Sequence, residues 1–275
     1  MARRIRLDAE LVRRGMARSR QHAADLIAAG RVTVSGTTAT KPATQVDPAQ
    51  PVEVQADPAG PEYASRGGHK LAGALDALGE AAPQVVGRRA LDAGASTGGF
   101  TDVLLRRGAA HVVAVDVGYG QLVWSLQNDP RVTVMDRTNI RTLDPATIDP
   151  PVELVVGDLS FISLTLVLPA LAAVTTPDAD LLLMVKPQFE VGKERLGAGG
   201  VVRDPALHLD AVLGVVEAAA GLGLGLRAAV ASPLPGPSGN VEYFVHLRRG
   251  PGVEDPAQVV RHAVETGPAQ EGVAS

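Results

Sequence analysis

Seven short, nearly continuous apolar runs, separated by helical segments, constrain the fold of this 275-residue chain most strongly. Such runs are typical of strands buried on both faces, as in parallel sheets covered by helices. We expect strands at residues 89–91, 111–115, 132–135, 152–156, 180–185, 226–231 and 241–247. Residues 232–240 are too few for a crossover helix, so the last strand should run antiparallel. The pattern predicts an α/β, doubly wound, seven-stranded and mostly parallel sheet.

The N-terminal part of the chain follows a different pattern. Residues 5–29 have helical periodicity with a break at Gly15, and Ser19 is a suitable cap for a second helix. Short strands are expected at residues 31–34 and 51–54. We therefore predict an α+β domain at 1–60, a linker at 61–64, the α/β domain at 65–250 and a tail at 251–275 with a helix at 255–265.

Charge is distributed unevenly between these two parts. Residues 1–42 have a net charge of +6, whereas the whole chain has −4. A basic segment attached to an acidic body indicates contact with a polyanion such as RNA, although the same charges are also compatible with solvated helix faces. The candidate phosphate contacts are Arg3, Arg4, Arg6, Arg18, Arg20 and Lys41.

Several classes of protein are disfavoured by composition. The chain has no cysteine, which excludes disulfides and thiolate metal sites, and we predict no metal site. The charged first eight residues lack the apolar run of a signal peptide. The longest apolar stretch, residues 164–174, is about half as long as a membrane helix requires and contains Pro169. We expect a cytoplasmic protein with no membrane partner, and the sequence leaves its oligomeric state open.

A glycine-rich turn follows the first strand of the α/β domain, at residues 91–100 (LDAGASTGGF). Glycines let the backbone turn tightly and approach a ligand. The carboxylate of Asp92 suits an amine or a cation better than a pyrophosphate, which favours S-adenosylmethionine. Asp116, at the end of the second strand, is placed to accept ribose hydroxyls, and Asp136, after the third, to contact adenine. The candidate cofactor contacts are Asp92, Gly94, Ser96, Gly98, Phe100, Asp116, Asp136 and Asp158.

Three alternatives fit the same turn. Residues 94–98 match the nucleophile elbow G-x-S-x-G, but this motif needs an acid and a catalytic histidine further along the chain. The available histidines, His208, His246 and His262, fall in a helix, a strand and the tail. A nicotinamide site and a purely structural glycine turn are the other two alternatives.

Four charged residues occur where an open α/β sheet binds its ligands. Asp158 follows the fourth strand, Lys186 ends the fifth, Glu242 follows the turn at 235–240, and Lys70 begins the first helix of the domain. Each one alone is commonly a solvated surface charge or a loop cap. Together they suit deprotonation of a weakly acidic hydroxyl, because burial and a second cation favour the neutral form of a lysine.

These residues resemble the K-D-K-E tetrad of FtsJ-like ribose 2′-O-methyltransferases. Further segments resemble the TlyA family, namely residues 65–71 (SRGGHKL), 92–101, 116–122, 158–163, 185–190 and 235–244. The resemblance implies a Rossmann-like methyltransferase domain, an N-terminal S4 domain and S-adenosylmethionine as cofactor. It also implies 2′-O-methylation of cytidine in 16S or 23S ribosomal RNA, or both, with Lys70, Asp158, Lys186 and Glu242 catalytic and Lys186 as general base.

The family is also associated with capreomycin susceptibility and with the label hemolysin. The linker PEYA at residues 61–64 departs from the form with Arg and Trp that the resemblance leads us to expect. Two other functions are alternatives to methyl transfer. A pore-forming hemolysin predicts a membrane-spanning or strongly amphipathic segment, and none is visible in the sequence. A non-catalytic ribosome assembly factor would not need the tetrad.

Overall fold

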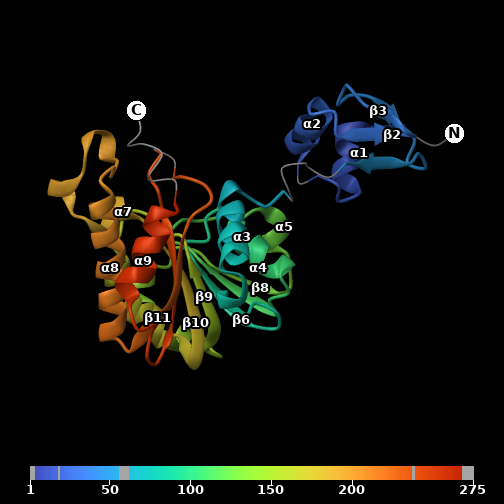
Figure 1. The fold of residues 1–275 in the computed structure, drawn as a ribbon. Helices are drawn as coiled ribbons and strands as arrows, with labels where there is room; N and C mark the ends of the chain where they lie inside the picture. Colours follow the sequence, from blue (N-terminus) through green and yellow to red (C-terminus); the bar gives the residue numbers. More distant parts are fainter. Residues whose placement is uncertain (1–3, 18, 56–61, 237–238, 268–275) are drawn as a thin grey trace. The chain divides into compact units, whose positions relative to one another are not determined.

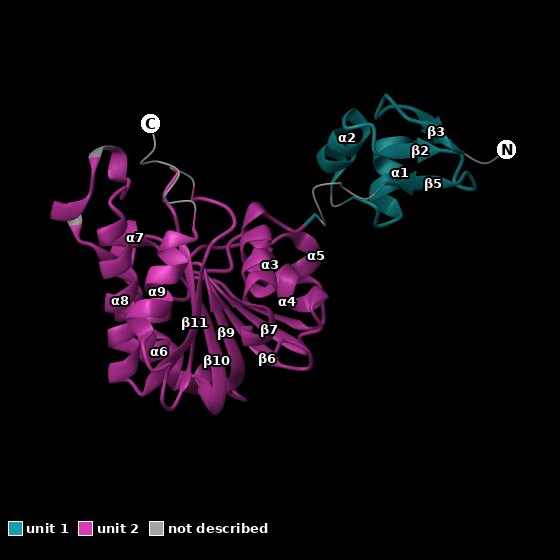
Figure 2. Cartoon of the chain, in the orientation of Figure 1, with its two compact units in different colours: residues 1–62 teal, residues 63–275 magenta. Residues whose placement is uncertain are grey.

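The chain divides after Glu62 into two units in its computed structural model (Figure 2). The structure describes residues 4–17, 19–55, 62–236 and 239–267. The boundary lies inside the linker expected at residues 61–64.

Unit 1 combines two helices with two small antiparallel sheets (Figure 1). Helices α1 and α2 pack together, and the apolar core between them and the strands includes Leu7, Leu11 and Ile27, all at most 2% exposed. Ser19 caps α2 by accepting a hydrogen bond from the amide of His22, as the sequence predicted. The elements are β1 Ile5–Arg6, α1 Leu7–Arg13, α2 Arg20–Ala28, β2 Val32–Val34, β3 Thr37–Thr38, β4 Gln45–Val46 and β5 Val52–Val54.

The helix expected from residue 5 begins two residues later. Ile5 and Arg6 instead form β1, which pairs antiparallel with β4, a strand that the sequence pattern did not reveal. A two-residue strand is too short to show an alternating pattern, and its conformation is set by its partner, which is distant in sequence. The prediction for these residues was therefore wrong.

Unit 2 contains a seven-stranded sheet in the order β11-β12-β10-β9-β6-β7-β8. Strands β6 to β10 run parallel to their neighbours, and β12 runs antiparallel to both β10 and β11. The predicted α/β fold with a reversed last strand is thus confirmed. The strands are β6 Arg89–Ala93, β7 His111–Val115, β8 Val132–Met135, β9 Val152–Gly157, β10 Thr175–Val185, β11 Leu224–Ala231 and β12 Tyr243–Arg249.

Helices cover both faces of this sheet (Figure 1). The first face packs against α3 (Arg66–Leu78), α4 (Gly99–Arg106) and α5 (Trp124–Gln127). The second packs against α6 (Leu168–Ala173), α8 (Pro205–Gly221) and α9 (Pro256–Glu265), while α7 (Pro187–Glu190) follows β10. Both α8 and α9 begin with an aspartate cap before a proline, a pattern that the sequence indicates for α9.

One helix begins earlier than expected. The sequence places Lys70 at the start of a helix, whereas α3 begins at Arg66, so Lys70 lies in its second turn. Gly67 and Gly68, which have low helix propensity, hide this first turn in the sequence. Gly68 is needed there because a Cβ would clash with the side chain of Tyr63, whose Cβ and Cγ are the nearest atoms.

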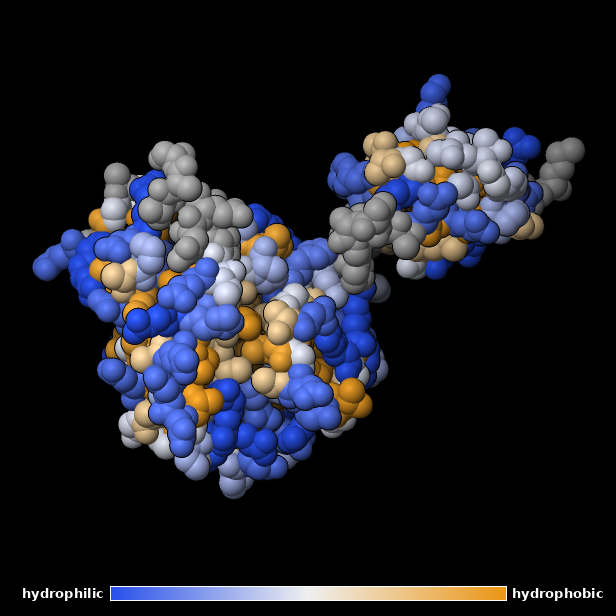
Figure 3. Space-filling model, in the orientation of Figure 1, coloured by the Kyte–Doolittle hydropathy of each residue, from blue (hydrophilic) through white to orange (hydrophobic). Residues whose placement is uncertain are grey.

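In the described part of the chain, no helix is both long and apolar enough to cross a membrane. In the view of Figure 3, hydrophilic residues are distributed among hydrophobic ones over the surface of unit 2.

The contact between α3 and α4 depends on Gly99. A Cβ there would lie 2.3 Å from Ser65 Oγ and 2.7 Å from the amide nitrogen of Gly68. We expect Gly99→Ala to lower the free energy of unfolding by about 1–3 kcal/mol, because the backbone must move. Gly214→Ala is the control, since nothing lies within 4 Å of that position in the middle of α8, and should stabilise by about 0.5–1 kcal/mol. Equal effects of both substitutions in urea unfolding would contradict this packing argument.

Candidate active site

Sheet topology brings the ends of five strands to one edge. Ala93 of β6 pairs with Gly157 of β9 and with Val115 of β7, and Val185 at the end of β10 pairs with Tyr243 at the start of β12. The residues just beyond these positions therefore lie along a single row at this edge. Asp116, Asp158, Lys186 and Glu242 all lie in that row. The order of the strands reverses between β6 and β9, which is where open α/β sheets bind their ligands.

Lys70 and Glu242 form a buried ion pair. Lys70 Nζ donates to Glu242 Oε2 over 2.5 Å, although the two residues are 172 positions apart in the chain. Glu242 is fully buried and Lys70 is 6% exposed. Removing one partner of such a pair leaves an uncompensated charge, which typically costs about 3–5 kcal/mol. The pair thus fixes α3 against the turn before β12.

Lys186 and Asp158 form a second ion pair beside the first. Lys186 Nζ lies 2.5 Å from Asp158 Oδ1 and donates a hydrogen bond of 2.9 Å to Ser160 Oγ. The Lys186 side chain is 8% exposed, whereas that of Asp158 is 22% exposed. Among the four residues of the tetrad, Asp158 is thus the one that solvent or a ligand reaches most easily.

The glycine-rich turn approaches Asp158 closely. Gly94 has φ +83°, and a Cβ there would lie 2.8 Å from the carbonyl oxygen of Asp158. Only glycine fits this combination of conformation and contact. Gly98, with φ +100°, has a different role, because a Cβ there would meet the side chains of Leu126 and Leu122. Gly94 therefore allows the turn to lie close to Asp158, whereas Gly98 allows it to pack against α5.

Asp116 holds the other side of the turn. Its carboxylate accepts hydrogen bonds from the amides of Ser96 (2.8 Å) and Gly118 (2.7 Å). Ser96 itself has a positive φ of 47°, a conformation that the bond to Asp116 helps to hold. Because each carboxylate oxygen has a second lone pair, Asp116 can still accept a hydrogen bond from a ligand.

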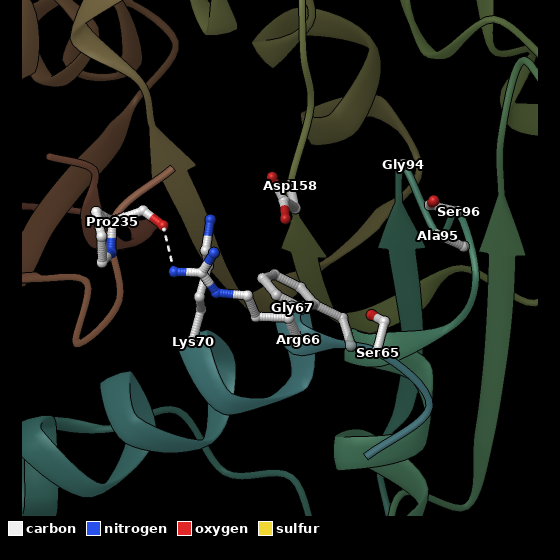
Figure 4. A pocket seen from close by; sticks show the side chains of 11 residues that line it. Ser65, Arg66, Gly67, Lys70, Gly94, Ala95, Ser96, Asp158 and Pro235 are labelled. Carbon is white, nitrogen blue, oxygen red and sulfur yellow. Dashed lines mark hydrogen bonds between the residues drawn. The ribbon is translucent and has the colours of Figure 1, made fainter. Parts of the chain in front are cut away.

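Three cavities meet around the tetrad. The first, of about 200 Å³, is lined by Lys70, Phe100 and Asp158 together with the glycine-rich turn (Figure 4). The second, of about 500 Å³, shares Gly94, Ser96 and Asp158 with the first and extends past Asp116. The third, of about 320 Å³, is lined by Lys186 and Glu242 and shares Ser160 and Phe161 with the second. The tetrad thus separates two connected cavities from a third.

Asp92, near the end of β6 and two positions before Gly94, is fully buried. Its Oδ2 accepts a hydrogen bond of 2.7 Å from the hydroxyl of Thr101, and its Oδ1 has no hydrogen-bond partner among the described residues. Burial raises the pKa of Asp92 to about 7, and the nearby carboxylates of Asp158 and Asp116 add to this rise. A buried, unpartnered carboxylate oxygen fits a site built to receive positive charge.

The predicted cofactor residues thus divide into two groups. Gly94, Ser96, Phe100, Asp116 and Asp158 line the first two cavities. Asp92, Gly98 and Asp136 do not, and they support the loops behind. Asp136, for example, accepts a hydrogen bond from the amide of Gly120 (2.8 Å).

Several cavity residues escaped the sequence analysis. Ser160 lies only two positions after Asp158, so the segment was recognised but not the hydroxyl that contacts Lys186. Thr138 and Asn139 line the second cavity after β8, whereas the sequence pattern pointed to the acid two positions earlier, Asp136. Arg66 borders the first cavity and donates to the carbonyl oxygen of Pro235, as Figure 4 shows.

The geometry around Ser96 does not resemble a nucleophile elbow. The hydroxyl of Ser96 lies 3.4 Å from Gln121 Oε1. The ring nitrogens of His208 form hydrogen bonds with Tyr243 and Val202. Those of His246 form hydrogen bonds with Asp180 and Ala81. Neither histidine is available to activate Ser96.

Two of the predicted RNA contacts in unit 1 also have an internal partner. Arg6 and Arg20 each place an NH2 group 2.9 Å from Asp8 Oδ2, and these contacts, that of Arg6 most strongly, hold the pKa of Asp8 well below its usual range. Their side chains remain 45% and 60% exposed. Arg4 and Lys41 are exposed, and Arg3 and Arg18 lie outside the described residues.

The raised pKa of Asp92 predicts a pH-dependent stability difference. An acid whose pKa is higher in the folded than in the unfolded state lowers the free energy of unfolding as pH rises. For Asp92 this loss develops between the unfolded-state pKa, near 4, and the folded-state pKa, about 7. Without cofactor, the stability of Asp92→Asn relative to the wild type should therefore increase by about 2–3 kcal/mol between pH 5 and pH 8.

Urea unfolding at these two pH values measures the difference. Asp129→Asn is the control, because its hydrogen bond to Arg131 lowers the pKa of Asp129 and its contribution should not change over this range. A stability difference for Asp92→Asn that does not depend on pH would refute the assignment.

Comparison with known proteins agrees with this geometry. Residues 63–249 match the family model of FtsJ-like methyltransferases, and residues 5–52 match the S4 domain. The chain is 58% identical to the 16S/23S rRNA (cytidine-2′-O)-methyltransferase TlyA of Mycobacterium tuberculosis, over 98% of this chain and all of that protein. It is 34% identical to a protein of Brachyspira hyodysenteriae named Hemolysin A, over 88% of this chain and 99% of that one.

Solved structures point the same way. A protein of Streptococcus thermophilus described as a hemolysin has a TM-score of 0.72 and 34% identity, covering 99% of this chain and 98% of its own. The chain therefore belongs to the TlyA family of FtsJ-like methyltransferases with an N-terminal S4 domain, and it is an S-adenosylmethionine-dependent methyltransferase.

Proposed function

We propose that this enzyme methylates the 2′ hydroxyl of cytidine in ribosomal RNA of one or both ribosomal subunits, with Lys186 as the general base. The observation that carries the proposal is the position of Lys186 Nζ. It lies at the boundary between the cavities along the glycine-rich turn and the separate cavity lined by Lys186 and Glu242. A proton acceptor at such a boundary can reach a hydroxyl in one cavity while the methyl donor is in the other.

The first two cavities fit the cofactor. Gly94 lines both cavities, and a side chain there would block the approach to Asp158. Within the described part of the chain, the buried Oδ1 of Asp92 has no hydrogen-bond partner. Gly94, Ser96, Asp116 and Asp158 would hold S-adenosylmethionine there. When bound, this group supplies a methyl on a sulfonium, which is open to attack by an oxygen nucleophile.

Lys186 must be neutral in order to accept a proton. Its ion pair with Asp158 favours the ammonium. Asp158 also lines both proposed cofactor cavities, so its carboxylate can interact with the positive charge of a bound cofactor in place of Lys186. A buried lysine that loses its counter-ion favours the neutral form. Ser160, which accepts a hydrogen bond from Lys186, would keep the amine directed at the boundary during this exchange.

The ion pair between Lys70 and Glu242 has a different role. Lys70 and Glu242 are more buried than Asp158, and their bond joins α3 to the turn before β12. We assign to this pair the positioning of the target ribose against Lys186.

The S4 domain would supply contacts to the RNA backbone. Phosphate contacts position a protein on RNA without reading sequence, so the selection of one cytidine falls to the methyltransferase domain. The target nucleotide would leave its stack to enter the site, at a cost of a few kcal/mol. A ribosomal RNA substrate places this proposed activity in the cytoplasm. The name of the Mycobacterium tuberculosis relative, which specifies cytidine-2′-O and rRNA, supports the same substrate.

The role of Lys186 can be separated from its charge. Lys186→Arg keeps a cation for Asp158 but has no neutral form at ordinary pH, so methyl transfer to ribosomal RNA should fall by at least about 100-fold. Cofactor affinity, measured by calorimetry, should change little because Lys186 does not line the cofactor cavities. Lys186→Arg with wild-type transfer rates would exclude this residue as the base.

RNA binding by unit 1 has a measurable salt signature. Each lost phosphate contact reduces the slope of log affinity against log salt by about one. The double variant Arg4→Ala, Lys41→Ala should therefore reduce the slope by about two. Arg107→Ala, which removes a cation paired with Asp76 in unit 2, is the control and should leave the slope unchanged. An unaltered slope in the double variant would mean that these residues do not contact phosphate.

A further inference from the structure

A glycine-rich segment between α7 and α8 forms one wall of the cavity that contains Lys186 and Glu242. We call residues 192–203 the strap. Its Leu196 and Gly200 line this cavity. Gly192, Gly199 and Gly200 have φ between +72° and +79°. A segment with so many glycines loses much entropy when it is ordered, so its position depends on its attachments.

The strongest attachment is a pair of hydrogen bonds to a single residue, Val202. Its amide donates to Asn240 Oδ1 over 3.0 Å, and its carbonyl oxygen lies 3.0 Å from His208 Nε2. All three residues are at least 96% buried. Both backbone groups of Val202 are thus bonded to side chains from outside the strap. We call this arrangement the Val202 clamp.

A hydrogen bond with Tyr243 fixes the orientation of the His208 ring in the clamp. Nε2 must carry a proton to donate to the carbonyl of Val202, so Nδ1 is free to accept from the hydroxyl of Tyr243, at 3.1 Å. Burial lowers the pKa of His208, which is consistent with this neutral tautomer. Asn240 and Tyr243 flank Glu242 in sequence, and the Asn240 side chain also donates to the carbonyl of Gly200 (3.1 Å). The clamp therefore links the strap to the segment that contains Glu242.

Other attachments of the strap are weaker. The ion pair between Arg195 and Asp210 is 2.5 Å long, but the two side chains are 48% and 56% exposed. Exposed pairs of this kind typically contribute only about 0–1 kcal/mol. Below the strap, Val202 packs with Val191 and Ala211 in a small apolar cluster. The buried hydrogen bonds are thus the specific determinants of where Leu196 and Gly200 lie.

We propose that His208, Asn240 and Tyr243 are positioning residues, which through the Val202 clamp hold the strap as the wall of the cavity that receives the target nucleotide. The proposal rests on the proposed function for the identity of that nucleotide. It follows that the clamp governs productive binding of RNA and not binding of the cofactor. The cavity behind the strap shares only Ser160 and Phe161 with the larger cofactor cavity, and His208 lines none of the three.

The test compares His208→Leu with His208→Gln. Leucine removes the donor to Val202, whereas the glutamine amide can restore it. For His208→Leu we expect the KM for ribosomal subunits that lack the modification to rise about tenfold, while the Kd for S-adenosylmethionine stays within about twofold. Trypsin cleavage after Arg195 in the cofactor-free protein should accelerate about tenfold. His208→Gln should recover at least part of both losses.

Asp210→Asn is the control within the same segment, because it breaks the exposed ion pair and leaves the clamp intact. Should His208→Leu fail to fold, as judged by a lost unfolding transition, Tyr243→Phe replaces it. That change removes one hydroxyl and should raise KM and cleavage about threefold.

Wild-type KM and cleavage rates in His208→Leu, or in Tyr243→Phe where that variant replaces it, would overturn the proposal, and so would equal effects in Asp210→Asn. If the wild type methylated no ribosomal RNA, the proposed function would fail, and the cleavage measurement would still decide whether the clamp holds the strap.

Discussion

Two lysine–carboxylate pairs at one edge of a parallel sheet determine how the rest of unit 2 must be arranged. Lys70–Glu242 and Lys186–Asp158 are both at 2.5 Å, and three of these four residues are at least 93% buried. A buried charge without its partner is strongly destabilising. These contacts therefore hold α3 against the turn before β12, and the end of β10 against the residues after β9. The same two pairs lie between the cavities along the glycine-rich turn and the cavity lined by Lys186 and Glu242.

The second ion pair differs from the first in accessibility, and this difference matters for chemistry. The Asp158 side chain is 22% exposed and lines both cavities along the glycine-rich turn, whereas Glu242 is fully buried. An ion pair with one exposed partner can rearrange when positive charge arrives, while a fully buried pair keeps its geometry. In the proposed mechanism, Lys186 is therefore the residue whose partner can rearrange, and Lys70 is a fixed support.

Much of this arrangement was predictable from the sequence because the fold places strand ends together. The apolar runs gave seven strands, and residues just after them became the row of Asp116, Asp158 and Lys186. Other features depend on contacts that no local pattern encodes. The strand at Ile5–Arg6 exists only through its pairing with β4, and Gly98 resembles a ligand-binding glycine although its space is occupied by Leu122 and Leu126. The Val202 clamp is likewise invisible in the sequence, because His208 and Tyr243 appear as ordinary members of a helix and a strand.

The most direct test of the central claim is to map ribose methylation in ribosomal RNA from a host that lacks the modification, with and without this enzyme. Nucleoside mass spectrometry of the mapped fragments identifies the methylated atom. If the enzyme methylates the ribose of cytidine, new 2′-O-methylcytidine should appear only when the enzyme is expressed. Methylation on a base, or no new methyl group in either ribosomal subunit, would contradict it.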